Sequence, residues 1–296
     1  MKRCFIVGTD WWTDCDDAVA MRILVRARMR GEIGISGIVI NASMEHSVAS
    51  LDGFLALESC DDVDIAIDLS GNDFGGRPPY QARLAPFAKR YRSNADAEDG
   101  VRAYRRMLAE ATEPVEIIEI GYPSTLAAVL KSGGDDLSEL SGAELFATRV
   151  KRMWVMAGKW DKDGERENNF ARNERARVAA HDFCRICPVP ITFLGWEVGH
   201  DVKTGGNLAP DDHLHLVLAD HGSAAGRSSW DPMLVLMALI GNEEEAGYTV
   251  VRGRAEVDAE DGRNHFYPSD NGPHSYVIRK FAPEYYKDAI NSMISS

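Results

Sequence analysis

Short apolar runs alternate with segments of helical periodicity along the first two thirds of the chain, and this alternation limits the possible folds more than any other feature. Apolar runs bounded by polar turns are typical of strands that are buried on both faces of a sheet. We expect such strands at residues 4–8, 33–40, 63–67, 115–120, 152–156 and 191–194. Strands that alternate with helices favour a mostly parallel central sheet flanked by helices, which is an open, Rossmann-like α/β architecture.

The segments between these strands have the periodicity of amphipathic helices. We predict helices at residues 16–30, 46–59, 126–130 and 283–293. Near the end of the chain, residues 248–251 and 276–279 resemble edge or hairpin strands. The sequence shows no internal repeat and no linker, so we expect a single domain over residues 1–296.

The chain is acidic, with 46 Asp and Glu residues against 33 Lys and Arg residues and a formal net charge of -13. Such a surface repels nucleic acid and anionic membranes, so we expect neither as a partner. A solvated acidic surface explains most of this charge, but part of it can serve a divalent cation. Hydrophobic residues make up 45% of the chain, which is enough for a large core.

The five cysteines are scattered, which is typical of a reducing cytoplasm and not of a disulfide framework. Cys184 and Cys187 form a single CxxC pair, and the absence of a second pair favours a structural role over a zinc or redox role. The apolar run at the N-terminus is too short for a signal peptide, and no stretch is long enough to span a membrane. We therefore expect a cytoplasmic protein.

Four aspartates follow the first predicted strand within one short turn. Asp10, Asp14, Asp16 and Asp17 lie in the segment TDWWTDCDDA, where the first predicted helix begins. Helix capping explains one or two of them. Four like charges at close range cost free energy unless a cation neutralises them, and carboxylate oxygens are preferred ligands of calcium and magnesium. Because open α/β sheets bind ligands beyond the carboxyl ends of their strands, we predict a metal site here.

The same segment resembles the signature of the nucleoside hydrolase family. In that family a strand is followed by an Asp-rich motif, DxDxGxDD or the longer DTDxGTDxDDA, and then by a helix. The stretch GTDWWTDCDDA at residues 8–18 is similar to the longer form. Gly8 replaces the first Asp of the motif and Trp12 replaces its Gly, whereas Asp10, Asp16 and Asp17 are retained.

Four further motifs extend the resemblance along nearly the whole chain, in the order found in the family. Residues 121–127, GYPSTLA, resemble GPLTNLA, and residues 156–158, MAG, resemble MGG. Residues 167–170, ENNF, are similar to an E-x-N-hydrophobic motif, and residues 230–232, WDP, are similar to HDP.

The resemblance implies a calcium-dependent hydrolase that cleaves the N-glycosidic bond of a ribonucleoside to give ribose and a free base. In this resemblance calcium would be held by Asp10, Asp17, Asp231 and the backbone carbonyl of Ser124, with water and ribose hydroxyls as further ligands. The small-molecule nucleoside is the expected partner. Relatives form homodimers or homotetramers, so we expect one of these states.

Two aspartates compete for the role of general base, which takes the proton from the attacking water. Asp16 matches the base of the family when the motif is aligned on its Asp-Asp pair. Asp14 is the alternative, because the longer motif permits a second alignment. Either one could instead be a capping carboxylate.

The ribose contacts that the resemblance implies are Glu167, Asn169 and Asn41. Buried hydrogen bonds to hydroxyls discriminate strongly against sugars that lack them. Without the resemblance, Glu167 and Asn169 would be interpreted as part of a polar surface loop, and Asn41 as a turn residue that ends a strand.

Trp230 stands where members that accept inosine and uridine have a His that assists the leaving base. An indole cannot act as a general acid at neutral pH, but it can stack on a base, so we expect purines to be favoured over pyrimidines. Trp11 and Trp12 are either further aromatic surface over the site or core residues. His200 and His213 lie in a segment that could cover the pocket, so they are alternative acids. The region at residues 207–220 is predicted to contribute to the base pocket.

Two other interpretations remain open, and a third is disfavoured. The chain can act on a different N-ribosyl compound, or it can be a non-catalytic calcium- or ribose-binding relative, which Gly8 and Trp230 favour. A phosphatase with an Asp nucleophile is disfavoured, because Trp12 occupies the place of the second Asp that such an enzyme needs two positions after Asp10.

Overall fold

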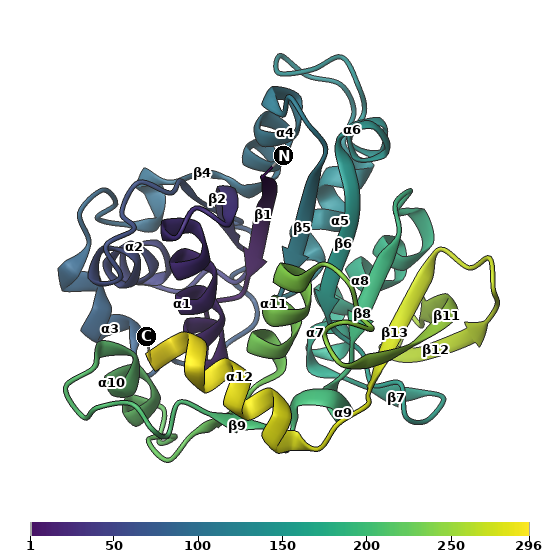
Figure 1. The fold of residues 1–296 in the computed structure, drawn as a ribbon. Coiled ribbons are helices and arrows are strands. Elements are labelled where there is room, and N and C mark those ends of the chain that lie inside the picture. The colour runs from purple at the N-terminus through teal and green to yellow at the C-terminus, as the bar shows by residue number, and fades with distance from the viewer. Residues whose placement is uncertain (1, 296) are drawn as a thin grey trace.

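The computed structural model describes residues 2–295 and contains one continuous sheet of eleven strands (Figure 1). Eight neighbouring strands are parallel to one another. In sheet order they are β4 (Glu98–Asp99), β3 (Ile65–Ile67), β2 (Ile33–Ile40), β1 (Arg3–Thr9), β5 (Val115–Glu119), β6 (Val150–Met156), β8 (Ile191–Leu194) and β13 (His274–Arg279). The predicted mostly parallel α/β sheet is therefore confirmed.

The far end of the sheet is antiparallel. It continues from β13 through β11 (Tyr248–Val257) and β12 (Arg263–Pro268) to the short β7 (Glu165–Arg166). The two late segments predicted as edge or hairpin strands are strands, and β11 forms an antiparallel hairpin with β12. Neither segment is at the edge of the sheet, because β12, which the sequence did not reveal, pairs with β11 on one side and β8 pairs with β13 on the other.

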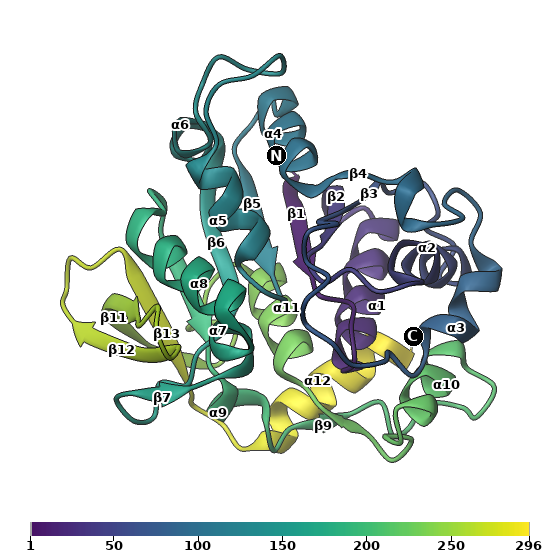
Figure 2. The same ribbon diagram turned by 180° about the vertical axis from the view of Figure 1, so that it is seen from behind.

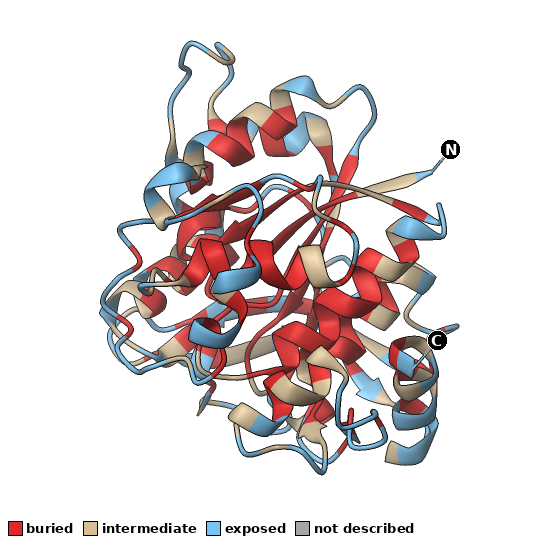
Figure 3. Cartoon of the chain, turned by 90° about the vertical axis from the view of Figure 1, so that its left-hand side faces the viewer, coloured by how far each residue is buried: buried red, intermediate tan, exposed pale blue. Residues whose placement is uncertain are grey.

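Helices cover both faces of the sheet (Figures 1 and 2). One face carries α1 (Asp16–Met29), α2 (Ser47–Leu57), α11 (Trp230–Ile240) and α12 (Pro283–Ser295). The opposite face carries α4 (Gly100–Glu110), α5 (Ser124–Lys131), α6 (Gly142–Arg149) and α8 (Glu174–Ile186). Figure 3 shows the buried residues concentrated in the strands and on the inner sides of these helices.

Shorter elements complete the chain. They are α3 (Gln81–Leu84), α7 (Asn168–Ala171), α9 (Trp196–Gly199), α10 (His213–Asp220), β9 (Lys203–Thr204), β10 (Arg227–Ser228) and two 3-10 helices at Ala85–Phe87 and Asn94–Asp96. Within residues 2–295, no helix is both long and apolar enough to cross a membrane. Cys184 and Cys187 are free and pack in the core beneath the α8 face, in agreement with a structural role.

The parallel strands bring distant loops to one edge of the sheet. β1, β2, β5 and β6 end next to one another, so the residues that follow them share this edge. Helices α1 and α11 pack against each other on one face, and both begin at the same edge. Residues that open these two helices are therefore placed beside those that follow β1.

Candidate functional site

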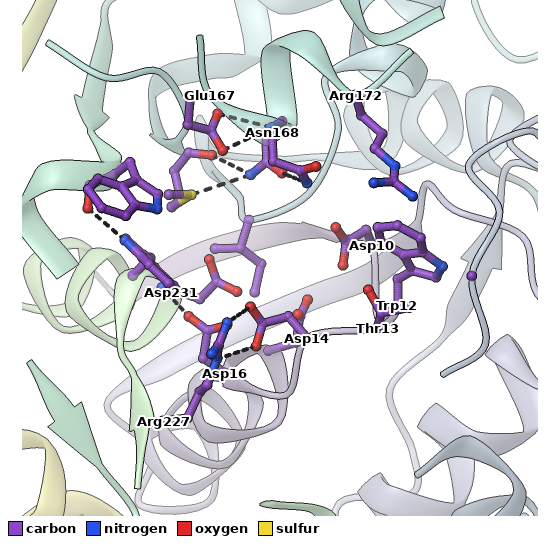
Figure 4. Close-up of a pocket in the computed structure, with 17 residues that line it drawn as sticks. Asp10, Trp12, Thr13, Asp14, Asp16, Glu167, Asn168, Arg172, Arg227 and Asp231 are labelled. Atoms are coloured by element: carbon purple, nitrogen blue, oxygen red, sulfur yellow. Dashed lines mark hydrogen bonds and ion pairs between the residues drawn. The ribbon is translucent and has the colours of Figure 1, made fainter. Parts of the chain in front are cut away.

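A pocket of about 380 Å³ lies at the carboxyl edge of the parallel strands (Figure 4). Its lining is mostly acidic on the side of α1 and α11, and polar and aromatic elsewhere. The lining residues are Asp10, Trp12, Thr13, Asp14, Asp16, Asp17, Gly76, Ile120, Met156, Glu167, Asn168, Asn169, Arg172, Trp196, Arg227, Trp230 and Asp231.

Three buried carboxylates meet at this pocket. Asp16 and Asp17 open α1, and Asp231 lies in the first turn of α11. One carboxylate oxygen of each lies within 4.8 Å of those of the other two. The backbone N–H of Asp231 donates to Asp16 Oδ2 at 3.1 Å, which joins the two helix starts. We call Asp16, Asp17 and Asp231 the aspartate trio.

The trio has no cationic side chain paired with it anywhere in residues 2–295. Burial, and then the charges of neighbouring aspartates, raise the pKa of Asp16 and Asp231 well above the usual range. Burial likewise raises the pKa of Asp17 to about 7. Three buried acids that resist ionisation at neutral pH, with their oxygens converging, are suited to a hard divalent cation.

Asp10 lines the same pocket but stands outside the trio. It follows β1 directly, and burial together with the charge of Asp17 raises its pKa well above the usual range. The expected set of Asp10, Asp17 and Asp231 is therefore brought to one pocket. The closest group of oxygens, however, contains Asp16 in place of Asp10.

Asp14 differs from the other four acids because its charge is already balanced. Arg227, in β10, donates to its two carboxylate oxygens at 2.7 and 2.5 Å. The backbone N–H of Cys15 donates to Asp14 Oδ1 at 2.7 Å. Arg227 was not among the residues predicted, since nothing near it in the sequence marks it as a partner of the acidic turn.

Backbone geometry fixes the orientation of Asp17. The hydroxyl of Thr9 and the backbone N–H of Trp11 both donate to Asp17 Oδ1. Trp11 has a φ of +44°, in the left-handed region that a bulky residue rarely adopts. This strained turn is held in place because the Trp11 ring is fully buried and its indole N–H donates to Ser50 Oγ at 2.9 Å.

Glu119 is a buried acid of the site that sequence reasoning missed. It is the β5 neighbour of Gly8, and a Cβ built on Gly8 would lie 2.0 Å from Glu119 Oε2. The Glu119 carboxylate thus fills the space beside position 8, where the family has an Asp. Burial raises the pKa of Glu119 to about 8, and its Oε2 has no hydrogen-bond partner within residues 2–295.

Asn41 is not among the residues that line the pocket, and its contact with the sugar remains a prediction. Its Nδ2 donates to Glu119 Oε1 at 2.8 Å, and its Oδ1 accepts from the backbone N–H of Tyr122 at 2.9 Å. The side chain is 1% exposed. Asn41 therefore connects the ends of β2 and β5 beneath the pocket, a role that depends on Glu119 and was invisible without it.

Glu167 and Asn169 form a rigid polar pair on the pocket wall. The Glu167 carboxylate accepts from the backbone N–H groups of Gly158 and Asn169, both at 2.9 Å. Asn169 Nδ2 donates to the carbonyl of Met156 at 2.9 Å. Both side chains are buried and line the pocket, and burial raises the pKa of Glu167 to about 7. Their contact with ribose remains a prediction.

Ser124 begins α5 and is buried, and its hydroxyl has no hydrogen-bond partner within residues 2–295. It is not among the residues that line the pocket. Its backbone carbonyl as a metal ligand remains a prediction.

Aromatic side chains form the remaining walls. Trp12 lines the pocket, whereas Trp11 is a core residue. Trp230 and Trp196 lie together, with ring centroids 6.3 Å apart, and the indole N–H of Trp230 donates to the Trp196 carbonyl at 2.7 Å. Trp230 therefore lines the pocket as predicted and leaves an aromatic surface at the start of α11.

Neither histidine proposed as an acid lines the pocket. His200 stacks on the Trp196 ring at 4.6 Å, and His213 pairs with Glu58 at 2.7 Å. No residue of the segment 207–220 lines the pocket either, and its contribution to a base pocket remains a prediction. The segment instead packs through α10 against α1.

No protein-family model and no curated protein matches the chain. Among solved structures, a plant nucleoside hydrolase is similar with a TM-score of 0.75 at 14% identity, over 100% of both chains. The inosine-uridine preferring nucleoside hydrolase of Bacillus anthracis has a TM-score of 0.69 at 13% identity, over 100% of this chain and 99% of that one. The type III effector protein XopQ, complexed with adenosine diphosphate ribose, has a TM-score of 0.67 at 14% identity, over 100% and 94%. At such identities the likeness establishes a nucleoside hydrolase-like fold.

Proposed function

We propose that this chain, which has a nucleoside hydrolase-like fold, is a calcium-dependent hydrolase that cleaves the N-glycosidic bond of ribosides to ribose and a free base. The observation that carries the proposal is the aspartate trio. It places three buried and unpaired carboxylates at a pocket that also presents the polar pair Glu167 and Asn169.

The donor set fits a hard cation. Asp17 and Asp231 would hold calcium, with Asp10 and the Ser124 carbonyl as the further ligands that we propose. When bound, the ion supplies a water of lowered pKa and orients the sugar hydroxyls. Thr9 and Trp11 hold Asp17 in the orientation that this role requires.

We assign the general base to Asp16 in preference to Asp14. A base must carry an available lone pair within reach of the attacking water. The two oxygens of Asp14 accept hydrogen bonds from Arg227, so fewer of their lone pairs are available to a water. Asp16 belongs to the trio and has no cationic partner within residues 2–295, and burial and nearby negative charge raise its pKa, so its ionised form is the stronger base.

The sugar would be bound by Glu167 and Asn169. Their positions are fixed by backbone groups of residues 156–158, so little ordering is needed when a ribose enters. Asn168, whose side chain donates to the Tyr122 hydroxyl at 3.1 Å, lies beside them on the pocket wall.

The leaving base would stack on Trp230 and Trp196. Among the described residues that line the pocket, the two on this side are Trp230 and Trp196, and an indole cannot donate a proton as a general acid. Departure of the base then depends on the base itself, so purine ribosides are expected to react faster than pyrimidine ribosides. A cytoplasmic homodimer or homotetramer completes the proposal, and light scattering checks the oligomeric state.

The proposal is tested by measuring free-base release from common ribonucleosides with calcium and with EDTA. Asp16→Asn is the variant, and Asp62→Asn, a change at an exposed surface ion pair, is the matched control. We expect cleavage by the wild type and the control, and loss of cleavage with EDTA and with Asp16→Asn. Full activity without metal would refute the mechanism. Calcium and ribose binding without any cleavage would establish the non-catalytic alternative.

A further inference from the structure

One wall of the pocket carries positive charge that the proposed hydrolysis does not use. Arg172 directly follows α7 and lines the pocket, with its guanidinium 4.6 Å from the ring centroid of Trp12. One of its N–H groups donates to the Phe74 carbonyl at 3.1 Å. Within residues 2–295 no carboxylate pairs with this guanidinium, so its charge is not neutralised.

The loop that Arg172 contacts adds unpaired donors to the same wall. Gly75, Gly76 and Arg77 make no hydrogen bond and no ion pair within the described chain. Gly76 lines the pocket with a φ of +82°, and a Cβ there would lie 2.9 Å from Trp12 and from Thr13. Of these three residues only Gly76 lines the pocket, so its backbone N–H is the loop donor that is available to an anion beside Arg172.

This wall lies across the pocket from the side of Trp230, where the leaving base would stack. Figure 4 shows Arg172 and Trp12 on one side and Asp231 on the other. A ribose that turns its C2′ and C3′ hydroxyls to the carboxylates and its base to Trp230 has one substituent left. That substituent is the C5′ group, and in this assumed orientation it would face Arg172.

We propose that the pocket selects nucleoside 5′-monophosphates, with the phosphate bound by Arg172 and the backbone N–H of Gly76. The inference rests on the proposed function, because the orientation of the sugar is taken from it. Arg forms paired, charge-assisted hydrogen bonds with phosphate oxygens. The unpaired guanidinium is then explained by the ligand, which supplies the anion that the protein lacks.

Binding of sugars tests the inference without any need for turnover. Calorimetry of the calcium-loaded protein compares ribose 5-phosphate with ribose, for the wild type, for Arg172→Gln and for Arg185→Gln, a control that removes an exposed charge from α8. We expect ribose 5-phosphate to bind at least about tenfold more tightly than ribose, and Arg172→Gln to remove most of that difference. The control should retain the difference in affinity. Added salt should weaken the binding of ribose 5-phosphate and leave the binding of ribose unchanged.

Equal affinities for the two sugars, or an unchanged difference in Arg172→Gln, would overturn the inference and leave the nucleoside hydrolase proposal intact. Tight binding of ribose 5-phosphate without cleavage of any nucleoside or nucleotide would support the inference and refute the hydrolase. If neither sugar binds to folded, calcium-loaded protein, both proposals fail. In the active enzyme, kcat/KM should be higher for a nucleotide than for its nucleoside, and Arg172→Gln should lower only the former.

Discussion

Gly8 has no side chain, and the space beside it is filled by the Glu119 side chain from the neighbouring strand β5. Gly8 leaves room for the Glu119 carboxylate, which in turn holds the Asn41 amide and the backbone N–H of Gly121 at 2.9 Å. An acid is thus present at this point of the site although it comes from β5 and not from β1.

This arrangement predicts that Gly8→Ala destabilises the protein. The added Cβ would meet three atoms of the Glu119 carboxyl group within 2.7 Å, and overpacking of this kind costs about 1–3 kcal/mol. Urea unfolding measures the change. Gly133→Ala is the control, because nothing lies within 4 Å of a Cβ there. Equal stability of the two variants would contradict the close packing of the Glu119 carboxyl group against Gly8.

The residues that the sequence predicted best are those that belong to a short local sequence motif. Asp16, Asp17, Glu167 and Asn169 were found from local motifs, and the structure brings them to one pocket. The hydrogen bonds of Asn41 were not predicted, because its partners lie far away in the sequence, at Glu119 and Tyr122. No local pattern distinguishes an Asn that binds a ligand from one that connects two strands.

Between elements, a buried ion-pair network joins α1, α2 and α10. The Arg22 guanidinium is 1% exposed, pairs with Glu58 at the end of α2, and donates to both oxygens of Asp212 at 2.8 and 2.7 Å. His213 also contacts Glu58, at 2.7 Å. The network holds α1, and therefore Asp16 and Asp17, against the neighbouring helices.

We expect Arg22→Met to lower the free energy of unfolding by about 1.5–3 kcal/mol, because Glu58 would lose its charge-assisted hydrogen bond and keep only His213 and the more distant Arg26. Chemical denaturation gives the value. Arg30→Met, which removes an exposed Arg paired with Glu32, should change stability by less than about 1 kcal/mol. A small loss in Arg22→Met would mean that the network contributes little to the position of α1.

Strands buried on both faces were predictable at the level of elements, since continuous apolar runs mark them. Residues 33–40 and 191–194 match β2 and β8 in full. The two-residue strands β4 and β7 carry no such run and form only through pairing with distant strands. β12 was missed because its residues, RNHFYP, lack an alternation strong enough to mark it.

For the molecule as a whole, the buried acids link stability to pH. The pKa of Asp17 is about 7 in the folded, metal-free protein against 3.8 ordinarily, so between these values the folded state holds a proton that the unfolded state releases. Metal-free stability should therefore fall as pH rises from about 4 to about 7. Calcium favours the ionised carboxylates, so it should raise the Tm more at pH 8 than at pH 5. An equal rise of the Tm at both pH values would contradict this linkage. Comparing the Tm with and without calcium at each pH cancels the contribution of other titrating groups, such as His274.

The most direct test of the account is the affinity of the pocket for calcium, with Asp10, Asp17, Asp231 and the Ser124 carbonyl as the proposed ligands. Isothermal titration of the metal-free protein should show one calcium ion per chain. Asp231→Asn should weaken binding at least about tenfold while keeping the fold, since it removes one charged ligand. Asp62→Asn should bind calcium as the wild type does. No detectable binding by folded wild-type protein, or an unchanged affinity in Asp231→Asn, would contradict the claim that a divalent cation lies among these carboxylates.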